Sequence, residues 1–418
     1  MLHQFTFKNF KSFKNEVTLN LLASSIKEHQ SDVVIDLANE QVLKVAAIYG
    51  ANASGKSNVL SAFNMMRKFV LGSFKKSESN LFLNMSPYWF EEEGVPTEFS
   101  VLFSTEKNIY QYGFSILGQK VYEEYLFQRD LSKKKEKYIT LFEKEEDNYS
   151  GELLQEIDLE TILKLIEDDT LLLSLLAQLK LPSVQEVFNW FKNTQTVNYG
   201  DPKTESNDYI TFSDLKNSDP LVDFLEDEQN KKELEHFIRA VDIGIKEFGI
   251  FQSRKKDSSP KFGDLKAAIA YHKIPGTDKL FPVSIRDESS GTQKMISLYM
   301  DIKKVLDNGQ TLFIDELDAK LHPLLIRYIL ILFHDEKTNP KDAQLVFSTQ
   351  EIFTLDKENL RRDEIWFVDK DEDGVSDLYS LVDYVDDEDK KVRNDASYGK
   401  DYILGRYKSI PSIRKLEA

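Results

Sequence analysis

The chain has 418 residues, 41% of them apolar, which is enough for one large domain with an insertion or for two ordinary domains. It contains no cysteine, so disulfides, thiolate metal sites and cysteine nucleophiles are excluded, as is usual in a reducing cytosol. The formal net charge of −17 argues against non-specific coating of nucleic acid, because phosphate binding needs a positive surface.

Neither a signal peptide nor a membrane span is expected, so the sequence predicts a cytoplasmic protein without a membrane partner. The N-terminus alternates apolar and polar residues, and the longest apolar stretch (170–181) is too short and too interrupted to cross a bilayer. Basic clusters occur at 131–138 and 251–262. Solvated loops explain these clusters better than a DNA-binding patch does.

Strands are predicted for much of the first 150 residues. Residues 3–10 alternate like a half-buried strand, and 15–22 follow as its hairpin partner. A continuous apolar run at 42–49 predicts a buried strand, and a helix from Ser57 follows it. Alternation rich in Tyr, Phe, Val and Ile predicts an antiparallel meander over 97–128.

Helical periodicity dominates the middle of the chain, without heptads long enough for a coiled-coil arm. Strands then return, and the alternation of strands and helices resumes at 283. The sequence therefore predicts an N-terminal lobe (1–150), a helical insertion subdomain (151–247) and a C-terminal lobe (248–418).

A glycine-rich loop between the predicted strand and helix reads GANASGKS (50–57) and fits the P-loop pattern G-x-x-x-x-G-K-[ST]. Its glycines would let backbone N–H groups cradle phosphate oxygens. Lys56 would reach the β- and γ-phosphates of ATP, and the Ser57 hydroxyl would ligate Mg²⁺ at the helix N-terminus. The alternative is a glycine-rich strand–helix connection with an accidental lysine. The expected nucleotide-binding residues are Gly50, Ala51, Asn52, Ala53, Ser54, Gly55, Lys56, Ser57 and Asn58.

A second stretch, LFIDE (312–316), ends a buried strand with two carboxylates. Asp315 would hold Mg²⁺ through water, and Glu316 would polarise the attacking water. The alternative is an acidic turn at the end of a strand.

A third stretch, SSGTQ (289–293), precedes a helix that Asn308 and Gly309 are predicted to end. A Ser-Gly turn at a helix N-terminus is an anion site, but an ordinary N-cap at Ser290 explains the pattern better from its chemistry alone.

In chain order, GANASGKS, SSGTQ and LFIDE resemble the Walker A, signature and Walker B motifs of ABC-type ATPases of the SMC, RecF and Rad50 group. The resemblance implies an α/β P-loop NTPase fold of ABC type, with the antiparallel meander and the inserted helical subdomain. It also implies that Ser290, Gly291 and Gln293 close over the γ-phosphate held by another protomer. The expected assembly is a head-to-tail dimer, or a higher oligomer, with ATP and Mg²⁺ between protomers.

The chain is also similar to bacterial AAA/ABC ATPases of the RloA/AbiLi type. Four stretches carry this resemblance: FTFKNFKSF at the start, ESSGTQKMISL, LFIDELDAKLHPLL, and the tail from LRRDEIWFV to YILGRYKSIP. The ATPase subunits AriA of PARIS and PtuA of Septu are relatives in that group. The resemblance implies an anti-phage, abortive-infection role in which the ATPase is a sensor or scaffold. A phage-encoded trigger and a separate effector, often a nuclease, are the implied partners.

Gln350 stands where this group usually carries a switch histidine. Glutamine can hydrogen-bond a phosphate or a water but cannot take a proton, so we expect slow turnover by a catalytic set of Lys56, Glu316 and Gln350. About seventy residues follow Gln350, too few for the Toprim nuclease of OLD proteins. A RecF-like DNA repair ATPase and a pure scaffold stay open as alternative functions.

Three further features have structural alternatives. Residues 369–374 imitate a calcium loop but are better interpreted as a hairpin turn. Arg361 and Arg362 would form salt bridges or face a phosphate, with the salt bridges favoured. His322 would either cross a dimer interface or simply begin a helix before Pro323.

Overall fold

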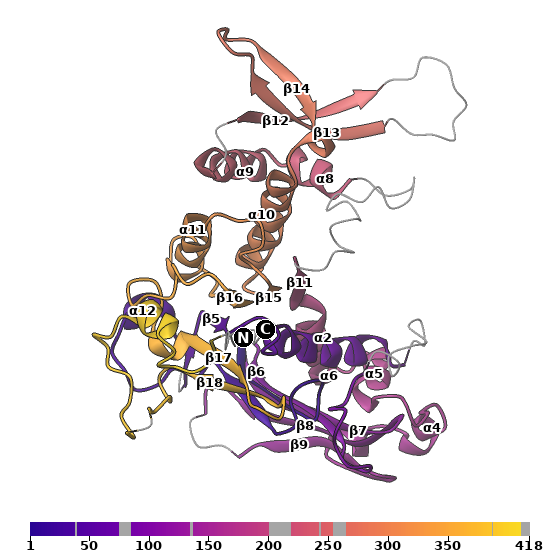
Figure 1. The fold of residues 1–418 in the computed structure, drawn as a ribbon. Coiled ribbons are helices and arrows are strands. Elements are labelled where there is room, and N and C mark those ends of the chain that lie inside the picture. Colours follow the sequence, from indigo (N-terminus) through magenta and orange to yellow (C-terminus); the bar gives the residue numbers. More distant parts are fainter. Residues whose placement is uncertain are drawn as a thin grey trace, which may run out of the picture.

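The structure, a computed structural model, describes residues 1–37, 40–74, 85–133, 137–199, 219–241, 244–253, 265–386 and 388–410. Residues 134–136 and 254–262 of the two basic clusters therefore lie outside the described residues. Two hydrophobic cores lie on opposite faces of a mostly parallel sheet (Figure 1). Among the described residues, no helix is both long and apolar enough to cross a membrane.

The central sheet has six strands in the order β11-β15-β16-β5-β17-β18, and only β18 runs antiparallel to its neighbour. Every residue of β5, β15 and β16 is buried. The strands β5 and β15 confirm the buried strands predicted at 42–49 and in LFIDE, but the first begins only at Val45, because residues 42–43 end β4 (Glu40–Leu43). The strands are β5 (Val45–Tyr49), β11 (Gln195–Asn198), β15 (Thr311–Asp315), β16 (Gln344–Ser348), β17 (Ile365–Lys370) and β18 (Ser376–Ser380). Because β5, β15 and β16 are parallel neighbours, the residues that follow them meet at one edge.

A seven-stranded antiparallel sheet forms the second layer, in the order β10-β9-β8-β7-β6-β1-β2. It confirms the predicted hairpin and meander, and β9 and β10 extend the meander beyond the predicted range. Its strands are β1 (Leu2–Lys8), β2 (Val17–Asn20), β6 (Thr97–Ser104), β7 (Asn108–Leu117), β8 (Lys120–Asp130), β9 (Ile139–Glu145) and β10 (Asn148–Ser150).

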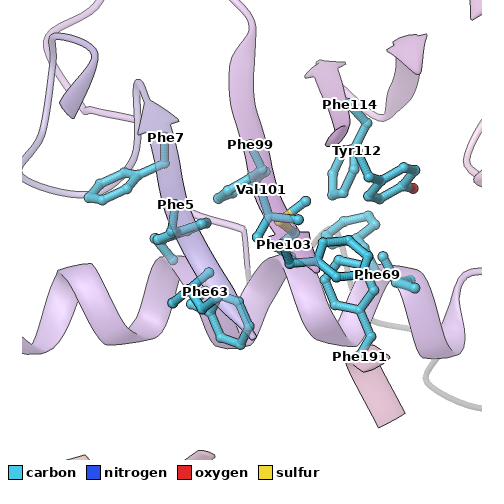
Figure 2. Packing of buried hydrophobic residues seen from close by; sticks show 14 of the residues in the cluster. Phe5, Phe7, Phe63, Phe69, Phe99, Val101, Phe103, Tyr112, Phe114 and Phe191 are labelled. Carbon is cyan, nitrogen blue, oxygen red and sulfur yellow. The ribbon is translucent and has the colours of Figure 1, made fainter. Parts of the chain in front are cut away.

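Helix α2 (Lys56–Gly72) packs against strands of both sheets. Figure 2 shows its part of the first core, next to aromatic residues of the antiparallel sheet. The ring of Phe63 on α2 packs edge-on against Phe5 of β1 at 5.3 Å. The same ring stacks on Phe313 of β15, with centroids 4.0 Å apart. The helix that begins at the P-loop is thus fixed to both sheets through one aromatic side chain.

The helical region 151–247 is divided between the two cores. Helices α4 (Leu159–Leu163), α5 (Leu172–Leu176) and α6 (Pro182–Asn193) join the first core, where Trp190 stacks on Phe103 at 4.1 Å. Helices α8 (Pro220–Glu226) and α9 (Glu228–Val241) join the second core. Between them the chain adds β11 to the edge of the parallel sheet. The apolar residues of these helices therefore cover two different surfaces.

The second core is built on α10 (Ser290–Asn308) and α11 (Pro323–His334). The αL residue Gly309 ends α10, as predicted. At one end of α10, a three-stranded antiparallel sheet packs on α8 and α9 (Figure 1). Its strands are β12 (Ile245–Ser253), β13 (Leu265–Lys273) and β14 (Leu280–Ser284). The other short elements are α1 (Gln30–Val33), β3 (Val34–Leu37), β4 (Glu40–Leu43) and α12 (Tyr398–Ile403), with 3-10 turns η1 (Leu153–Glu156), η2 (Ala177–Leu179), η3 (Ile285–Asp287) and η4 (Arg362–Glu364).

The structure decides two of the open alternatives. Residues 371–374 form the turn of the β17–β18 hairpin, with Gly374 at φ 81, and no group of three or more metal-binding side chains occurs among the described residues. Arg361 is buried in an ion pair with Asp363 at 2.7 Å, and Arg362 pairs with Glu28 at 2.6 Å.

His322 caps α11 through its Nδ1, which accepts a hydrogen bond from the Leu324 N–H at 3.2 Å. This contact agrees with the interpretation in which His322 simply begins a helix before Pro323.

Candidate nucleotide-binding site

The loop after β5 leaves no room for side chains at its two glycines. A Cβ at Gly50 would lie 2.5 Å from the carbonyl oxygen of Val368. Gly55 has φ 119, and a Cβ there would lie 2.7 Å from the hydroxyl of Ser376 and 2.9 Å from that of Ser12. These positions require glycine, and the loop is held tightly against the C-terminal hairpin and the N-terminal turn.

The lysine of this loop folds back onto its own backbone. Lys56 is 6% exposed, and its Nζ donates to the carbonyl oxygens of Gly50 at 2.7 Å and Ala51 at 2.9 Å. Burial lowers the pKa of Lys56, while Asp318, Asp315 and Glu316 oppose that shift. The ammonium group thus lies inside the curve of the loop, where a phosphate would be bound.

Among the described residues, the buried hydroxyl of Ser54 has no hydrogen-bond partner. Asn52 and Ala53 at the tip are exposed, and Asn58 reaches back to the Ser12 hydroxyl at 2.8 Å. A tight glycine cradle, an internal lysine and an unpartnered buried donor fit a polyphosphate ligand.

The structure brings Ser57 and Asp315 together, although they are far apart in sequence. The Ser57 hydroxyl donates to Asp315 Oδ1 at 3.1 Å, and the Ser348 hydroxyl donates to the same oxygen at 2.5 Å. Asp315 is 5% exposed, and both hydroxyls bond its carboxylate. A hydroxyl and a carboxylate at the helix start are suitable Mg²⁺ ligands.

Glu316 follows in the left-handed conformation, with φ 53. Its N–H donates to the Ser348 hydroxyl at 2.8 Å, which helps to hold this unusual backbone. Burial raises the pKa of Glu316, and Asp315 and Asp318 raise it further, against the opposing charges of Lys56 and Lys294. A half-buried carboxylate with a raised pKa suits a general base.

Gln350 lies at the same edge, two residues after β16. Its N–H donates to Asp318 Oδ2 at 3.2 Å, and its side chain is exposed. The sequence-predicted catalytic residues therefore come from three neighbouring strands.

The signature stretch begins α10, but the capping residue differs from the sequence interpretation. Ser289, not Ser290, is the N-cap, and its hydroxyl accepts the Thr292 N–H at 3.1 Å. Ser290 is the first helical residue and is exposed. Gln293 donates its side-chain amide to the Glu288 carbonyl at 2.9 Å, so it fixes the loop before the helix.

Gly291 is adjacent to the loop after Walker B. A Cβ there would lie 3.7 Å from the carbonyl oxygen of Lys320, which is an ordinary van der Waals contact. No described contact joins Ser290 or Gly291 to the P-loop of the same chain. The structure thus groups Walker A and Walker B but leaves the signature residues apart from them.

Lys294 ties the signature helix to the loop after Walker B. It is 1% exposed and donates to the carbonyl oxygens of Leu317 and Ala319. Its ammonium also lies 4.6 Å from the centre of the Tyr199 ring, and the Tyr199 N–H donates to the Asp315 carbonyl at 3.2 Å. A movement of α10 would therefore displace the contacts of Lys294 with the end of the Walker B strand.

Sequence reasoning missed Lys11, Ser12 and Ser348 at this site. Lys11 has φ 52 in the turn after β1, and its side chain is near enough to Asp315 for the two charges to interact. Ser12 lies against the P-loop, and Ser348 bonds to Asp315. Both Lys11 and Ser12 lie in the stretch FTFKNFKSF, which carries part of the family resemblance, but the sequence gives neither residue a role.

One protein family, described as "AAA domain, putative AbiEii toxin, Type IV TA system", matches residues 45–356. The chain belongs to this family. The match spans both Walker motifs, the signature stretch and Gln350. No curated protein matches the chain.

Several solved structures are similar over nearly the whole chain. An SmcHead bound to the C-winged helix domain of ScpA has 15% identity and a TM-score of 0.41, with 91% of this chain and 97% of that chain covered. An Smc head with an extended coiled coil, bound to the C-terminal domain of ScpA derived from Pyrococcus furiosus, has 14% identity and a TM-score of 0.39, with 91% and 96% covered. RecF with ATP has 16% identity and a TM-score of 0.33, with 90% and 97% covered.

The fold of this AAA family member is that of a P-loop NTPase. The assignment rests on the parallel strand order and on the P-loop between β5 and α2. ATP binding and hydrolysis, with Mg²⁺ as the usual metal, are the activity that the AAA family carries.

Ser348→Ala is expected to lower kcat for ATP hydrolysis about tenfold or more. The Glu316 N–H would lose its acceptor, and an unsatisfied buried donor costs about 1–3 kcal/mol. Steady-state ATPase rates check this. Ser380→Ala is the matched control, because Ser380 is a buried strand serine that bonds Asp383 away from the site. Equal rates for the two variants would contradict the assigned role of Ser348.

Proposed function

We propose that the protein is a slow ABC-type ATPase that acts as the sensor or scaffold subunit of an anti-phage defence system. A separate effector, a nuclease, would act downstream, and a phage-encoded trigger would act upstream. The family description, which names a toxin and a TA system, supports a defence role. The similarity to the RloA/AbiLi type supports the division between ATPase and effector.

The residues of the site have distinct roles in this proposal. The P-loop N–H groups and Lys56 would bind the phosphates, and Ser57 and Asp315 would hold Mg²⁺, which would supply positive charge to the phosphate oxygens. Glu316 takes a proton from the attacking water at its carboxylate. Lys11 adds positive charge near Asp315.

The proposal of slow turnover depends on the position of Gln350 at the edge of the parallel sheet that holds the site. It lies two residues after β16, with its N–H bonded to Asp318 and its side chain exposed, where the side chain could meet a phosphate or a water. An amide can orient either group but cannot gain charge. Bound ATP would then act mainly as a clamp.

The clamp is proposed to join two copies of the chain. Ser290 is exposed and is not needed as the helix cap, and within the part of the chain that the structure describes no contact joins it to its own P-loop. The positive N-terminus of α10 is suited to an anion. We therefore infer that Ser290 and Gly291 bind the γ-phosphate held by the other protomer.

Gln350→His is expected to raise the steady-state ATPase rate by about tenfold or more, within the range that a positioned acid or base contributes. An imidazole can carry charge next to the γ-phosphate, which the glutamine amide cannot do. Gln344→His is not a suitable control because Gln344 is buried, so Glu351→His at the next position serves instead. Equal rates for the wild type and Gln350→His would refute the proposed reason for slow turnover.

The defence role is tested by co-purification with the product of a neighbouring gene and by DNA binding of the purified protein. A stable complex that shows no affinity for DNA supports the sensor or scaffold role. Tight binding to DNA ends without a protein partner would favour the RecF-like alternative.

A further inference from the structure

Asp318 joins two loops at the edge of the parallel sheet where the carboxyl ends of its strands meet. It lies in the loop after β15, and Gln350 lies two residues after β16. The Gln350 N–H donates to Asp318 Oδ2 at 3.2 Å, across the gap between the two loops. The proposed hydrolysis uses Gln350 but does not use Asp318.

The loop that carries Asp318 is fixed on both sides of this residue. Leu317 is fully buried, and its N–H donates to the carbonyl oxygen of Ser348 at 3.1 Å. Lys294 of α10 is 1% exposed and donates to the carbonyl oxygens of Leu317 and Ala319, the two neighbours of Asp318 in the chain. The Asp318 carboxylate is therefore presented from a backbone that has little freedom to move.

The loop that carries Gln350 has fewer attachments. Thr349 is buried, and its N–H donates to the carbonyl oxygen of Ile48 at 3.0 Å, so the chain is still held by the sheet at this residue. The side chain of Gln350 is exposed. Within the described ranges, the bond to Asp318 is the single hydrogen bond of Gln350. Without it, no described contact would hold Gln350 at the edge of the sheet.

Asp318 brings a negative charge as well as a hydrogen-bond acceptor. Burial lowers the pKa of Lys56, and Asp318 opposes this shift more strongly than Asp315 or Glu316 does. The Asp318 carboxylate therefore lies near the ammonium group that would meet the phosphates. The two properties are separable by substitution, because asparagine keeps an oxygen acceptor and loses the charge.

We propose that Asp318 is a positioning residue that holds Gln350 beside the γ-phosphate through its hydrogen bond to the Gln350 backbone. The inference rests on the proposed ATPase function and on the part of Gln350 in it. A carboxylate is a stronger acceptor than a neutral group, and fixing the Gln350 N–H restricts where its carboxamide can reach. Because Lys294 holds both neighbours of Asp318, a shift of the signature helix would reach Gln350 through this bond.

A double-mutant cycle on the full chain tests whether Asp318 acts through Gln350. Asp318→Ala should lower kcat about tenfold and change the KM for ATP less than about threefold, because a misplaced group slows the chemical step. Gln350→Ala should also lower kcat by about tenfold or more. In the Gln350→Ala background, Asp318→Ala should change kcat less than about twofold, because no side chain remains to be positioned.

The conservative variant separates the hydrogen bond from the charge. Asp318→Asn should keep kcat within about threefold of the wild type, because the amide oxygen can accept the same N–H. If the charge alone mattered, the asparagine and alanine variants would be equally slow. Asp356→Ala is the matched control, since Asp356 is also half-buried and accepts the Glu358 N–H at 2.7 Å, and its kcat should change less than about twofold. Melting temperatures check that the variants are folded.

Hydrogen–deuterium exchange of the Gln350 N–H, measured without nucleotide, reports the bond independently of hydrolysis. Exchange should be at least about tenfold faster in Asp318→Ala than in the wild type, and close to the wild-type rate in Asp318→Asn. Equal exchange in the wild type and Asp318→Ala would overturn the proposal. Additive losses in the cycle, or a wild-type kcat for Gln350→Ala, would do the same. A wild type that hydrolyses no ATP would instead refute the proposed ATPase function, and the exchange rates would then decide whether Asp318 holds Gln350.

Discussion

Glu316→Gln is expected to lower ATP hydrolysis by about 10²- to 10⁴-fold while ATP binding is kept. Glutamine preserves the size of the side chain but cannot accept the proton of the attacking water. With ATP and Mg²⁺ the variant should therefore accumulate as a dimer or a larger particle. Mass in solution, measured with and without ATP, checks this result for the variant and for the wild type.

Glu351→Gln is the matched control, because it makes the same change at a half-buried carboxylate whose single bond among the described residues is from the Phe353 backbone N–H, at 2.7 Å. It should hydrolyse ATP like the wild type and should not accumulate as a dimer. A mass of Glu316→Gln that never responds to ATP would remove the evidence for a nucleotide-dependent assembly.

The wild-type rate should also depend on pH through Glu316. Burial raises the pKa of this carboxyl, and only its deprotonated form can accept a proton. Activity should therefore be present at higher pH and be lost, on acidification, at a pH above the usual range for glutamate. The residual activity of Glu316→Gln should lack that acidic limb.

Ser290→Arg is expected to abolish the ATP-dependent dimer. It should also lower the rate of ATP hydrolysis by at least about tenfold, because removal of a hydrogen-bond donor from an anion-stabilising site typically lowers kcat by that factor or more. The helix itself should survive, because Ser289 provides the cap. ATP affinity of the monomer should change less than about threefold, as Ser290 is not in contact with its own P-loop. Asn308→Arg, at the other exposed end of α10, is the control.

Mixing two inactive variants tests whether the signature acts in trans. Lys56→Ala lacks a working P-loop, and Ser290→Arg lacks a working signature. A head-to-tail dimer of one of each contains one intact composite site, so the mixture should hydrolyse ATP faster than either variant alone. A mixture as inactive as its parts would show that Ser290 acts within its own chain or not at all.

Local signals were sufficient for the strands and for the P-loop. The pattern GANASGKS depends on residues within one turn, and the required glycines at Gly50 and Gly55 are visible in it. Buried strands such as β5 and β15 appear as short apolar runs because both of their faces are covered. The hairpin at Gly374 was likewise evident from its neighbours.

The sequence by itself determined the type of fold and the candidates for nucleotide binding, since these follow from spacing and periodicity along the chain. Only the tertiary structure decided which distant groups meet. It placed the Ser348 hydroxyl between Asp315 and Glu316, set Lys11 near Asp315, and divided the helices of 151–247 between two cores. Such contacts depend on how strands and helices pack side by side, and one sequence carries no local pattern for that packing.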